Sequence, residues 1–196
     1  MSNSTLHDEG WIALPIDAKF ERMAKEMRVQ RDQQYGNIYE ETATDERWVG
    51  DLGEKVFDSW LKHENIQAFE WKKDNAAGQP DFILSNGIKI GIKTVKRKVP
   101  PRQDYTAQIT AKHATEPIHF FFFMSYEIEK QTMWLLGGID RERFLKEARY
   151  YSAGEKVHPK YEIRKGHEIY NIEIFKLLKP HDFLQNIINV PPVTRL

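Results

Sequence analysis

The sequence predicts an α/β protein in which helices cover a mixed β-sheet, and three patterns lead to this fold class. The first is an apolar stripe with fourfold spacing from Trp48 to Trp60, the strongest helical pattern in the chain. The second is a set of three successive segments with strand character, at 66–73, 81–85 and 88–99. The third is the run HFFFFM at 119–124, which is too short and too apolar for anything but a strand buried on both faces. Helices packed around such strands form an α/β sandwich.

Two helices are expected in the N-terminal part of the chain. The first covers 15–36 and is opened by Asp17. Its apolar stripe, which we expect only to pack, consists of Phe20, Met23 and Met27. The second begins near residue 44 or 45 and ends at about 64. Glycine destabilises a helix by roughly 1 kcal/mol relative to alanine. We therefore expect Gly50 and Gly53 to allow close approach of this helix to the sheet.

The strands at 81–85 and 88–99 are joined by Asn86-Gly87, a turn-forming pair that predicts a hairpin. The following segment, DYTAQITAKH at 104–113, is ambiguous because Tyr105, Ala107 and Ile109 alternate as in a strand. We favour a short helix there.

The C-terminal half continues with a second core strand at 132–139. Asp140 is placed to cap a helix of about ten residues, and the tail at 166–187 adds one strand and a short terminal helix. We divide the chain into an N-terminal helical extension, 1–43, and a single domain, 44–196, whose C-terminal additions pack on the same core.

The composition is that of a globular protein. Its 196 residues are enough for one domain, with 40% apolar and 30% charged residues. A mean hydropathy of −0.64 and the lack of a long uncharged apolar run predict no membrane span. The absence of cysteine excludes disulfides and thiolate metal sites. The N-terminus lacks the pattern of a signal peptide, so we expect a cytoplasmic location.

A net charge of zero conceals a basic segment. Residues 81–104 contain six Lys or Arg and two Asp or Glu. A basic strand with a basic exit loop can bind phosphate groups, and it can equally be a solvated strand edge that guards against aggregation. The charge pattern alone does not separate these two interpretations.

The stretch with the clearest chemistry is Pro80-Asp81, followed across the hairpin by Gly91-Ile92-Lys93. The turn folds one strand back on the other, so the carboxylate of Asp81 and the amine of Lys93 can meet. Hydrolysis of a phosphodiester needs oxygen ligands for a hard divalent cation and a positive group near the phosphate. Asp81 and Lys93 are of the right chemical types. The seven histidines show no metal-ligand spacing, and His113 alone falls near this stretch.

This pattern resembles the PD-(D/E)XK nuclease superfamily, whose signature is Pro-Asp, a gap across a hairpin, and then an acid, any residue and Lys. The resemblance includes Glu54 on the preceding helix and the element order from about 45 to 124. It implies a restriction-endonuclease-like αβββαβ core with a central mixed sheet flanked by helices. The alternative for Glu54 is a solvated helix acid.

One position departs from the signature, because its middle acid falls on Gly91. Three explanations compete. The acid has migrated, with Glu70, Asp74 and Asp104 as possible donors; or the protein is a catalytically dead nuclease that still binds DNA; or the glycine is an introduced Glu→Gly change. We favour the third, because the other elements of the signature are intact.

The resemblance implies a magnesium-dependent DNA nuclease, for which Mn²⁺ can substitute, inactive as it stands if Gly91 is a defect. Asp81 would hold the cation, with Glu54 acting through water and the backbone carbonyl group of Ile92 as further ligands, and Lys93 would position the attacking water. Expected nucleic-acid contacts are Lys96, Arg97, Lys98, Arg102 and Gln108. The expected partner is double-stranded DNA, bound by a homodimer and with no membrane involved. The alternatives are a non-catalytic DNA-binding or interaction module and, further, a junction resolvase or an RNA-directed nuclease.

Overall fold

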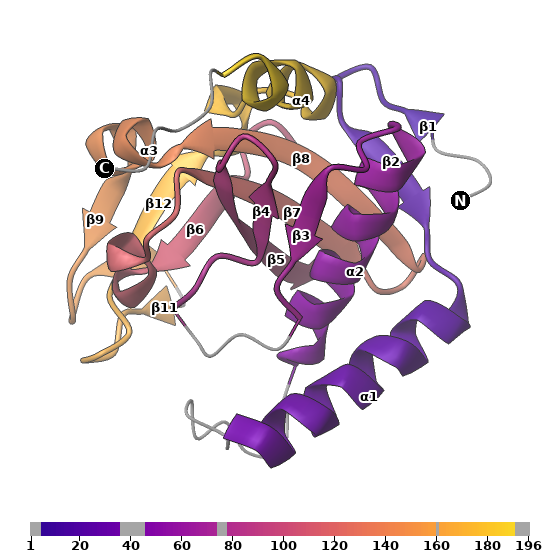
Figure 1. Ribbon diagram of the computed structural model, residues 1–196. Coiled ribbons are helices and arrows are strands. Elements are labelled where there is room, and N and C mark those ends of the chain that lie inside the picture. The colour runs from indigo at the N-terminus through magenta and orange to yellow at the C-terminus, as the bar shows by residue number, and fades with distance from the viewer. Residues whose placement is uncertain (1–4, 36–45, 74–77, 160, 191–196) are drawn as a thin grey trace.

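The computed structural model describes residues 5–35, 46–73, 78–159 and 161–190, and its centre is a seven-stranded β-sheet (Figure 1). The strands are β1 (Thr5–Leu6), β2 (Ile12–Pro15), β3 (Phe69–Trp71), β4 (Phe82–Leu84), β5 (Lys89–Arg97), β7 (Phe120–Glu127) and β8 (Thr132–Asp140). Their order across the sheet is β1-β2-β8-β7-β5-β4-β3. β5 and β7 are parallel and the other neighbours are antiparallel. The predicted α/β class with a mixed sheet is therefore confirmed.

Different elements cover the two faces of this sheet (Figure 1). One face packs against α2 (Trp48–His63) and α4 (Pro180–Asn189), and α1 (Ala18–Tyr35) lies against α2. The opposite face packs against α3 (Arg141–Glu147) and a second sheet of three strands. That sheet has the order β6 (Thr106–Thr110), β12 (Ile169–Glu173), β9 (Arg149–Tyr151). The remaining elements are the hairpin strands β10 (Lys156–His158) and β11 (Tyr161–Glu162) and the short 3₁₀ helices η1 (Ala111–Thr115) and η2 (Ile174–Lys176).

β7 is buried on both faces, as its sequence predicts. Because side chains alternate along a strand, its phenylalanines divide between two cores. The ring of Phe122 lies 4.9 Å from that of Phe57 on α2, and the ring of Phe121 lies 5.2 Å from that of Phe144 on α3. The run of four phenylalanines thus joins both layers of the molecule to the sheet.

The hairpin between β4 and β5 has the predicted turn. Gly87 has φ +83°, a left-handed conformation that favours glycine, and its amide donates to the carbonyl oxygen of Leu84 at 2.9 Å. Antiparallel pairing places Phe82 opposite Ile90. One step further back, Asp81 comes to lie beside Gly91, with its amide donating to the carbonyl oxygen of Ile90 at 3.0 Å.

The two helical glycines differ in their surroundings. A Cβ atom on Gly53 would lie 1.9 Å from Oγ1 of Thr94 on β5, so this glycine lets α2 approach the sheet closely. Nothing lies within 4 Å of the position of a Cβ on Gly50. The expectation of close approach is therefore confirmed for Gly53 and wrong for Gly50.

The helix expected over 104–113 is wrong. Residues 106–110 form strand β6, in which Gln108 pairs with Asn171 of β12, and η1 follows directly. Ala107 and Ile109 are buried on this strand, which agrees with the alternation of apolar residues. The partner strand comes from about 60 residues further along the chain, which a local pattern cannot reveal. Where the resemblance implies a helix between the third and fourth core strands, the chain has β6 and η1 instead.

The N-terminal segment contains more than the expected helix. β2 pairs with β8 and so extends the central sheet before α1 begins. α1 is capped by Asp17, whose Oδ1 accepts from the amide of Lys19 at 2.6 Å. Its packing stripe differs from the prediction, because Met23 is exposed and Ala24 is fully buried. The division of the chain after residue 43 lies outside the described residues and stays a prediction.

The C-terminal elements follow the predicted order. Asp140 caps α3 by accepting from the amide of Arg143 at 2.9 Å. The helix is shorter than expected, since it ends at Glu147 and the next residues form β9. Within the described residues, no helix is both long and apolar enough to cross a membrane.

Candidate active site

Asp81, just before β4, lies at the centre of a group of charged side chains. Its Oδ2 atom accepts a hydrogen bond from the amide of Ile92 at 2.6 Å, so the carboxylate is fixed against β5. Burial first, and then the nearby charge of Glu54, raise the pKa of Asp81 to about 8 against the opposing effect of Lys93. The ionised form of Asp81 is therefore disfavoured by burial and by the neighbouring acid.

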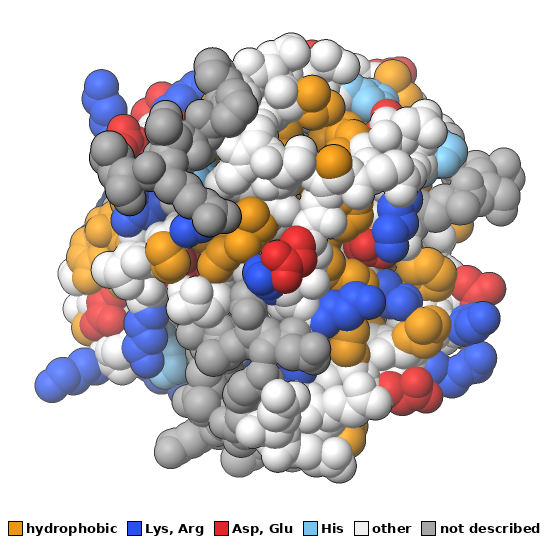
Figure 2. Space-filling model, in the orientation of Figure 1, with side chains coloured by type: hydrophobic (Ala, Val, Ile, Leu, Met, Phe, Trp, Pro, Cys, Tyr) orange, Lys and Arg blue, Asp and Glu red, His pale blue; other side chains and the backbone are white. Residues whose placement is uncertain are grey.

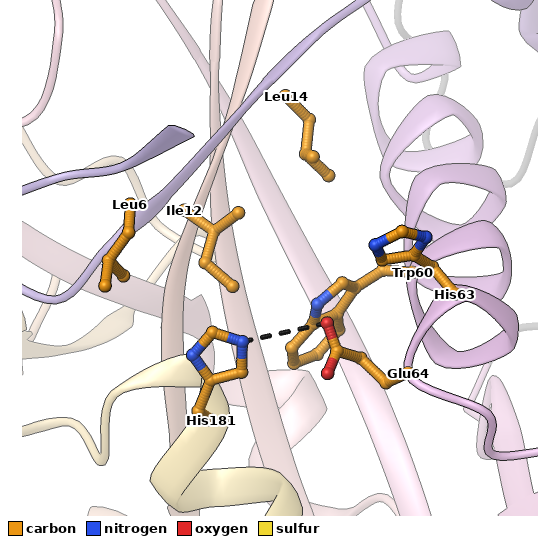
Figure 3. Close-up of a pocket in the computed structure, with 7 residues that line it drawn as sticks. All are labelled: Leu6, Ile12, Leu14, Trp60, His63, Glu64 and His181. Carbon is orange, nitrogen blue, oxygen red and sulfur yellow. Dashed lines mark ion pairs between the residues drawn. The ribbon is translucent and has the colours of Figure 1, made fainter. Parts of the chain in front are cut away.

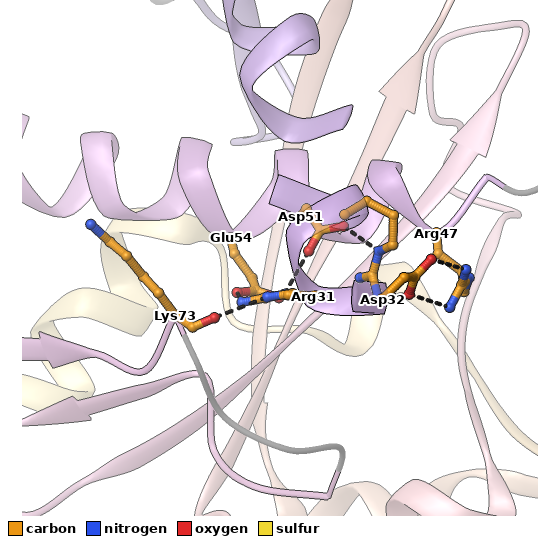
Figure 4. Close-up of polar contacts among 7 residues, drawn as sticks. Arg31, Asp32, Arg47, Asp51, Glu54 and Lys73 are labelled. Carbon is orange, nitrogen blue, oxygen red and sulfur yellow. Dashed lines mark hydrogen bonds and ion pairs between the residues drawn. The ribbon is translucent and has the colours of Figure 1, made fainter. Parts of the chain in front are cut away.

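Glu54, whose charge acts on Asp81, projects from α2 toward Arg31 (Figure 4) and is only 8% exposed. Arg31 of α1 donates to both of its oxygens, from Nη1 at 2.9 Å and from Nη2 at 2.8 Å. The indole Nε1 of Trp71 on β3 donates to Oε2 of the same carboxylate at 3.1 Å. The alternative of a solvated helix acid is therefore wrong, because Glu54 is buried and held from two sides.

Arg31 also joins the group to a second buried acid, Asp51, one turn earlier on α2 (Figure 4). Asp51 is fully buried, and it accepts from Nη1 of Arg31 and from Nε of Arg28, both at 2.6 Å. Burial alone would lower the pKa of Arg31, but its hydrogen bonds to Glu54 and the charges of Glu54, Asp51 and Asp81 raise it. The first helix therefore supplies a cation to the group, beyond the packing role expected from its sequence.

Lys93 of β5 approaches from the neighbouring strand and makes two polar contacts. Its Nζ donates to Oε2 of Glu116 at 3.1 Å and lies 3.2 Å from Nδ1 of His113. His113 and Glu116 also contact each other through Nδ1 and Oε1. Burial would raise the pKa of Glu116, but the hydrogen bond to His113 and the charge of Lys93 together lower it. Glu116 is thus a buried carboxylate held in its charged form.

We call Glu54, Asp81, Lys93 and Glu116 the acid–lysine cluster. Asp81 connects its two sides, because the charges of Glu54, Lys93 and Glu116 all act on its pKa. The sequence predicted three of the four members. Glu116, its partner His113, and Arg31 were missed as site residues. The signal that could have pointed to Arg31 is the pair of arginines at 28 and 31, one helical turn apart and too basic for a purely apolar packing face.

Gly91 lies beside the cluster on β5. A Cβ atom at this position would be 3.8 Å from Cε of Lys93 and 2.9 Å from Cδ1 of Ile118. A side chain at 91 would therefore point to the same side of the strand as Lys93, as the sequence predicts. Ile92 contacts Asp81 through its amide nitrogen; the expected role of its carbonyl oxygen as a cation ligand stays a prediction.

Two of the possible donors of a migrated acid, Glu70 and Asp104, form ion pairs outside the cluster. Glu70 is exposed and forms an ion pair with Lys72, and Asp104 is exposed and forms one with Arg102. Neither ion pair includes a member of the cluster. Asp74 lies outside the described residues.

The predicted nucleic-acid contacts are spread over two sheets. Lys96 forms an ion pair with Glu46, and Arg97 lies 4.6 Å over the ring of Tyr105. Lys98 is exposed at the end of β5, whereas Gln108 is exposed on β6 in the second sheet. The basic segment is therefore partly neutralised by its own neighbours, and of its three basic residues named here only Lys98 is exposed.

A small cavity of about 50 Å³ lies at the other end of α2 (Figure 3). Its lining residues are Leu6, Ile12, Leu14, Trp60, His63, Glu64 and His181. Its lining is mostly apolar. Its residues from α2 are at the C-terminal end of that helix, whereas Glu54 lies in the first two turns. It therefore adds nothing to the cluster.

No three His, Asp or Glu side chains form a metal-holding group in the described ranges. No protein-family model matches the chain, and no curated protein matches it either. The fold and the cluster thus define a mixed α/β protein with buried carboxylates around a lysine, and the function has to be inferred from that chemistry.

Proposed function

We propose that this protein is a magnesium-dependent DNA nuclease with a restriction-endonuclease-like core. The observation that carries the proposal is the meeting of Glu54 on α2, Asp81 just before β4 and Lys93 on β5, which are 27 and 12 positions apart along the chain. Their separation in the chain makes this meeting a property of the fold. A carboxylate pair beside an amine is suited to phosphodiester hydrolysis.

The donor set fits a hard divalent cation. Carboxylate oxygens are the ligands that Mg²⁺ prefers, and a raised pKa at Asp81 means that added positive charge would stabilise its ionised form. Asp81 would bind the cation directly, and Glu54 would bind it through a water molecule. The carbonyl oxygen of Ile92 would be the remaining ligand that the protein supplies. The cation supplies a polarised phosphate and a more acidic water.

The other residues of the site would orient the carboxylates and neutralise charge on the phosphate. The ammonium group of Lys93, which contacts Glu116, can stabilise the charge that develops on the phosphate. Arg31 fixes the carboxylate of Glu54 through both oxygens, so its lone pairs point in defined directions. The amide of Ile92 does the same for Asp81.

The test is cleavage of supercoiled plasmid DNA with Mg²⁺, Mn²⁺ or EDTA. We expect cation-dependent cleavage that falls at least about 100-fold in Asp81→Asn and in Lys93→Met, since each change removes about 3 kcal/mol or more of transition-state stabilisation. The matched control is Glu70→Gln, an exposed acid outside the cluster that should leave the rate unchanged. Full activity of Asp81→Asn would contradict the proposal.

A second candidate is a non-catalytic DNA-binding module of the same fold. Two observations favour it: Arg31 already satisfies both oxygens of Glu54, and position 91 has no acid. The same preparation separates the two candidates, because a module binds a labelled duplex and leaves it intact in Mg²⁺. A panel of duplex, four-way junction and RNA substrates separates a restriction-like enzyme from a resolvase or an RNA-directed nuclease.

A further inference from the structure

We propose that Glu116 supplies the second acid of the active site, in place of the acid that position 91 lacks. This inference rests on the proposed function and names one more residue of the same site. It makes Gly91 a native feature of an active protein, in contrast to the introduced change that the sequence favours.

The first observation is the contact between Glu116 and Lys93. Oε2 of Glu116 lies 3.1 Å from the lysine ammonium, and the two residues are 23 positions apart in the chain. An acid at position 91 would project on the side of β5 that carries Lys93, because a Cβ there points at the lysine stem. Glu116 therefore brings a carboxylate to the group that a residue at 91 would reach.

The second observation is the reach of this carboxylate toward Asp81. The charge of Glu116 contributes to the raised pKa of Asp81, and its carboxylate is placed beside Asp81's neighbour Lys93 by the 3.1 Å contact between Oε2 and Nζ. The side chain of Glu116 is 6% exposed, and its contacts with His113 and Lys93 lower its pKa against the effect of burial. A buried carboxylate that is kept charged beside another acid is available to a cation.

The third observation concerns the space around Gly91. The end of Ile118 fills the position of a side chain at 91, since its Cδ1 would lie 2.9 Å from a Cβ there. Ile118 is itself 5% exposed. A glutamate lost from this position would leave a void beside β5. The glycine and the isoleucine instead fit one another, and Ile118 lies two residues from Glu116.

The backbone around Glu116 fixes its direction. Glu116 directly follows η1, and its amide donates to the carbonyl oxygen of His113 at 3.2 Å, while its own carbonyl oxygen accepts from the amide of Ile118 at 2.8 Å. These bonds are local to the segment before β7, which is tied to β5 by the amide of His119 donating to the carbonyl oxygen of Lys89 at 2.8 Å. Glu116 and Ile118 reach the site together, the first with its carboxylate and the second with its apolar side chain.

The experiment measures cation binding directly, by isothermal titration calorimetry of Mn²⁺ and Mg²⁺ with the full chain. We expect Glu116→Gln to weaken binding at least about tenfold, and Glu70→Gln, the matched exposed acid, to leave it unchanged. Gly91→Glu in the otherwise unchanged chain should alter the affinity less than about threefold, because Glu116 already supplies the second carboxylate. Gly91→Glu combined with Glu116→Gln should recover affinity lost in Glu116→Gln.

The outcomes separate this inference from the proposed function. If Asp81→Asn abolishes cation binding and Glu116→Gln does not weaken it, the nuclease proposal stands and the role of Glu116 is wrong. If Gly91→Glu raises the affinity by orders of magnitude, the glycine is a defect and the inference is overturned. If neither the original chain nor Gly91→Glu binds a cation, both fail. The Gly91→Glu comparison decides the matter even where Glu116→Gln does not fold.

Discussion

Asp81 carries its charge at a cost to the folded state, because its carboxyl group is buried and lies near two other acids. Its folded pKa of about 8 is above the ordinary value of 3.8, so the folded protein binds more protons than the unfolded chain between these pH values. The stability of the cation-free protein should therefore fall as the pH rises through this window.

Asp81→Asn removes this charge and keeps an oxygen for the amide of Ile92. We expect it to raise the free energy of unfolding above pH 8 by on the order of 1–3 kcal/mol, and to gain little near pH 4. Urea unfolding in EDTA at both pH values measures the difference. Lys93→Met, which removes a compensating cation, should have the opposite sign; equal stability of the original protein and Asp81→Asn at high pH would contradict the charge crowding.

His119 gives a pH dependence of the other sign. Its Nδ1 accepts from the amide of Lys89 at 2.9 Å, joining the first residues of β5 and β7, and burial together with the charge of Lys89 lowers its pKa. The stability that it contributes is fully present above its ordinary pKa of 6.5 and is lost as the pH falls below that value.

His119→Asn keeps an acceptor that does not titrate. The free energy of unfolding of the original protein should decline relative to this variant as the pH falls from 7 to 5. Parallel curves for the two proteins over this range, from urea unfolding, would show that His119 does not titrate with folding.

At the scale of elements, α1 and α2 are joined by buried ion pairs as well as by apolar packing. Arg28 and Arg31 of α1 both form ion pairs with the fully buried Asp51 of α2. Asp32 of α1 forms an ion pair with Arg47, just before α2 (Figure 4). A buried acid that loses its cationic partner is strongly destabilising. The junction should therefore depend on its arginines.

Arg31→Met leaves Glu54 without its cation and Asp51 with one partner. We expect the free energy of unfolding to fall by about 3 kcal/mol, against less than about 0.5 kcal/mol for Arg22→Met, an exposed arginine on the same helix. Adding Glu54→Gln should recover part of the loss. A fall of the same size in both single variants would mean that the arginines act through helix propensity.

The elements also show where prediction from sequence succeeds. Long or strongly patterned segments such as α2, β5 and β7 were predicted because burial on one or both faces leaves a local pattern. β1, β2 and the strands from β9 to β11 have two to four residues each and are defined by distant partners, which no local window contains. β6 shows the same limit, since its helical alternative was excluded only by pairing with β12.

The same division holds for the site. Asp81 and Lys93 were predictable because a hairpin of defined length brings them together, and Glu54 because the resemblance places an acid on the preceding helix. Glu116 and Arg31 reach the cluster across 23 positions each, from Lys93 and Glu54 respectively, through contacts between elements that no local pattern relates. Site residues supplied by tertiary packing are those that the sequence does not reveal.

At the scale of the whole molecule, a protein with no net charge has to bind a polyanion through a local patch. The face over α1 and α2 carries both signs of charge (Figure 2), so it provides no such patch. The end of β5 is the basic alternative. Lys98 is about 16 Å beyond Lys93 along an extended strand, a reach of a few nucleotides from the cluster. A homodimer, which sedimentation velocity would detect, would double this surface.

Lys96→Ala with Lys98→Ala tests the patch. Each lysine that neutralises a phosphate contributes about 0.9 to the slope of log K against log salt concentration. Lys98 is exposed, whereas Lys96 has to leave Glu46 to reach DNA, so the slope should fall by about 0.9 if Lys98 acts alone and by about 1.8 if both bind. Fluorescence anisotropy with a labelled duplex, at salt concentrations from about 50 to about 200 mM, measures the slope.

The control variant is Lys156→Ala with Lys165→Ala. It removes the same charge from exposed positions away from the central sheet and should leave the slope unchanged. Equal slopes in the original protein and the Lys96 and Lys98 variant would make the end of β5 a solvated strand edge.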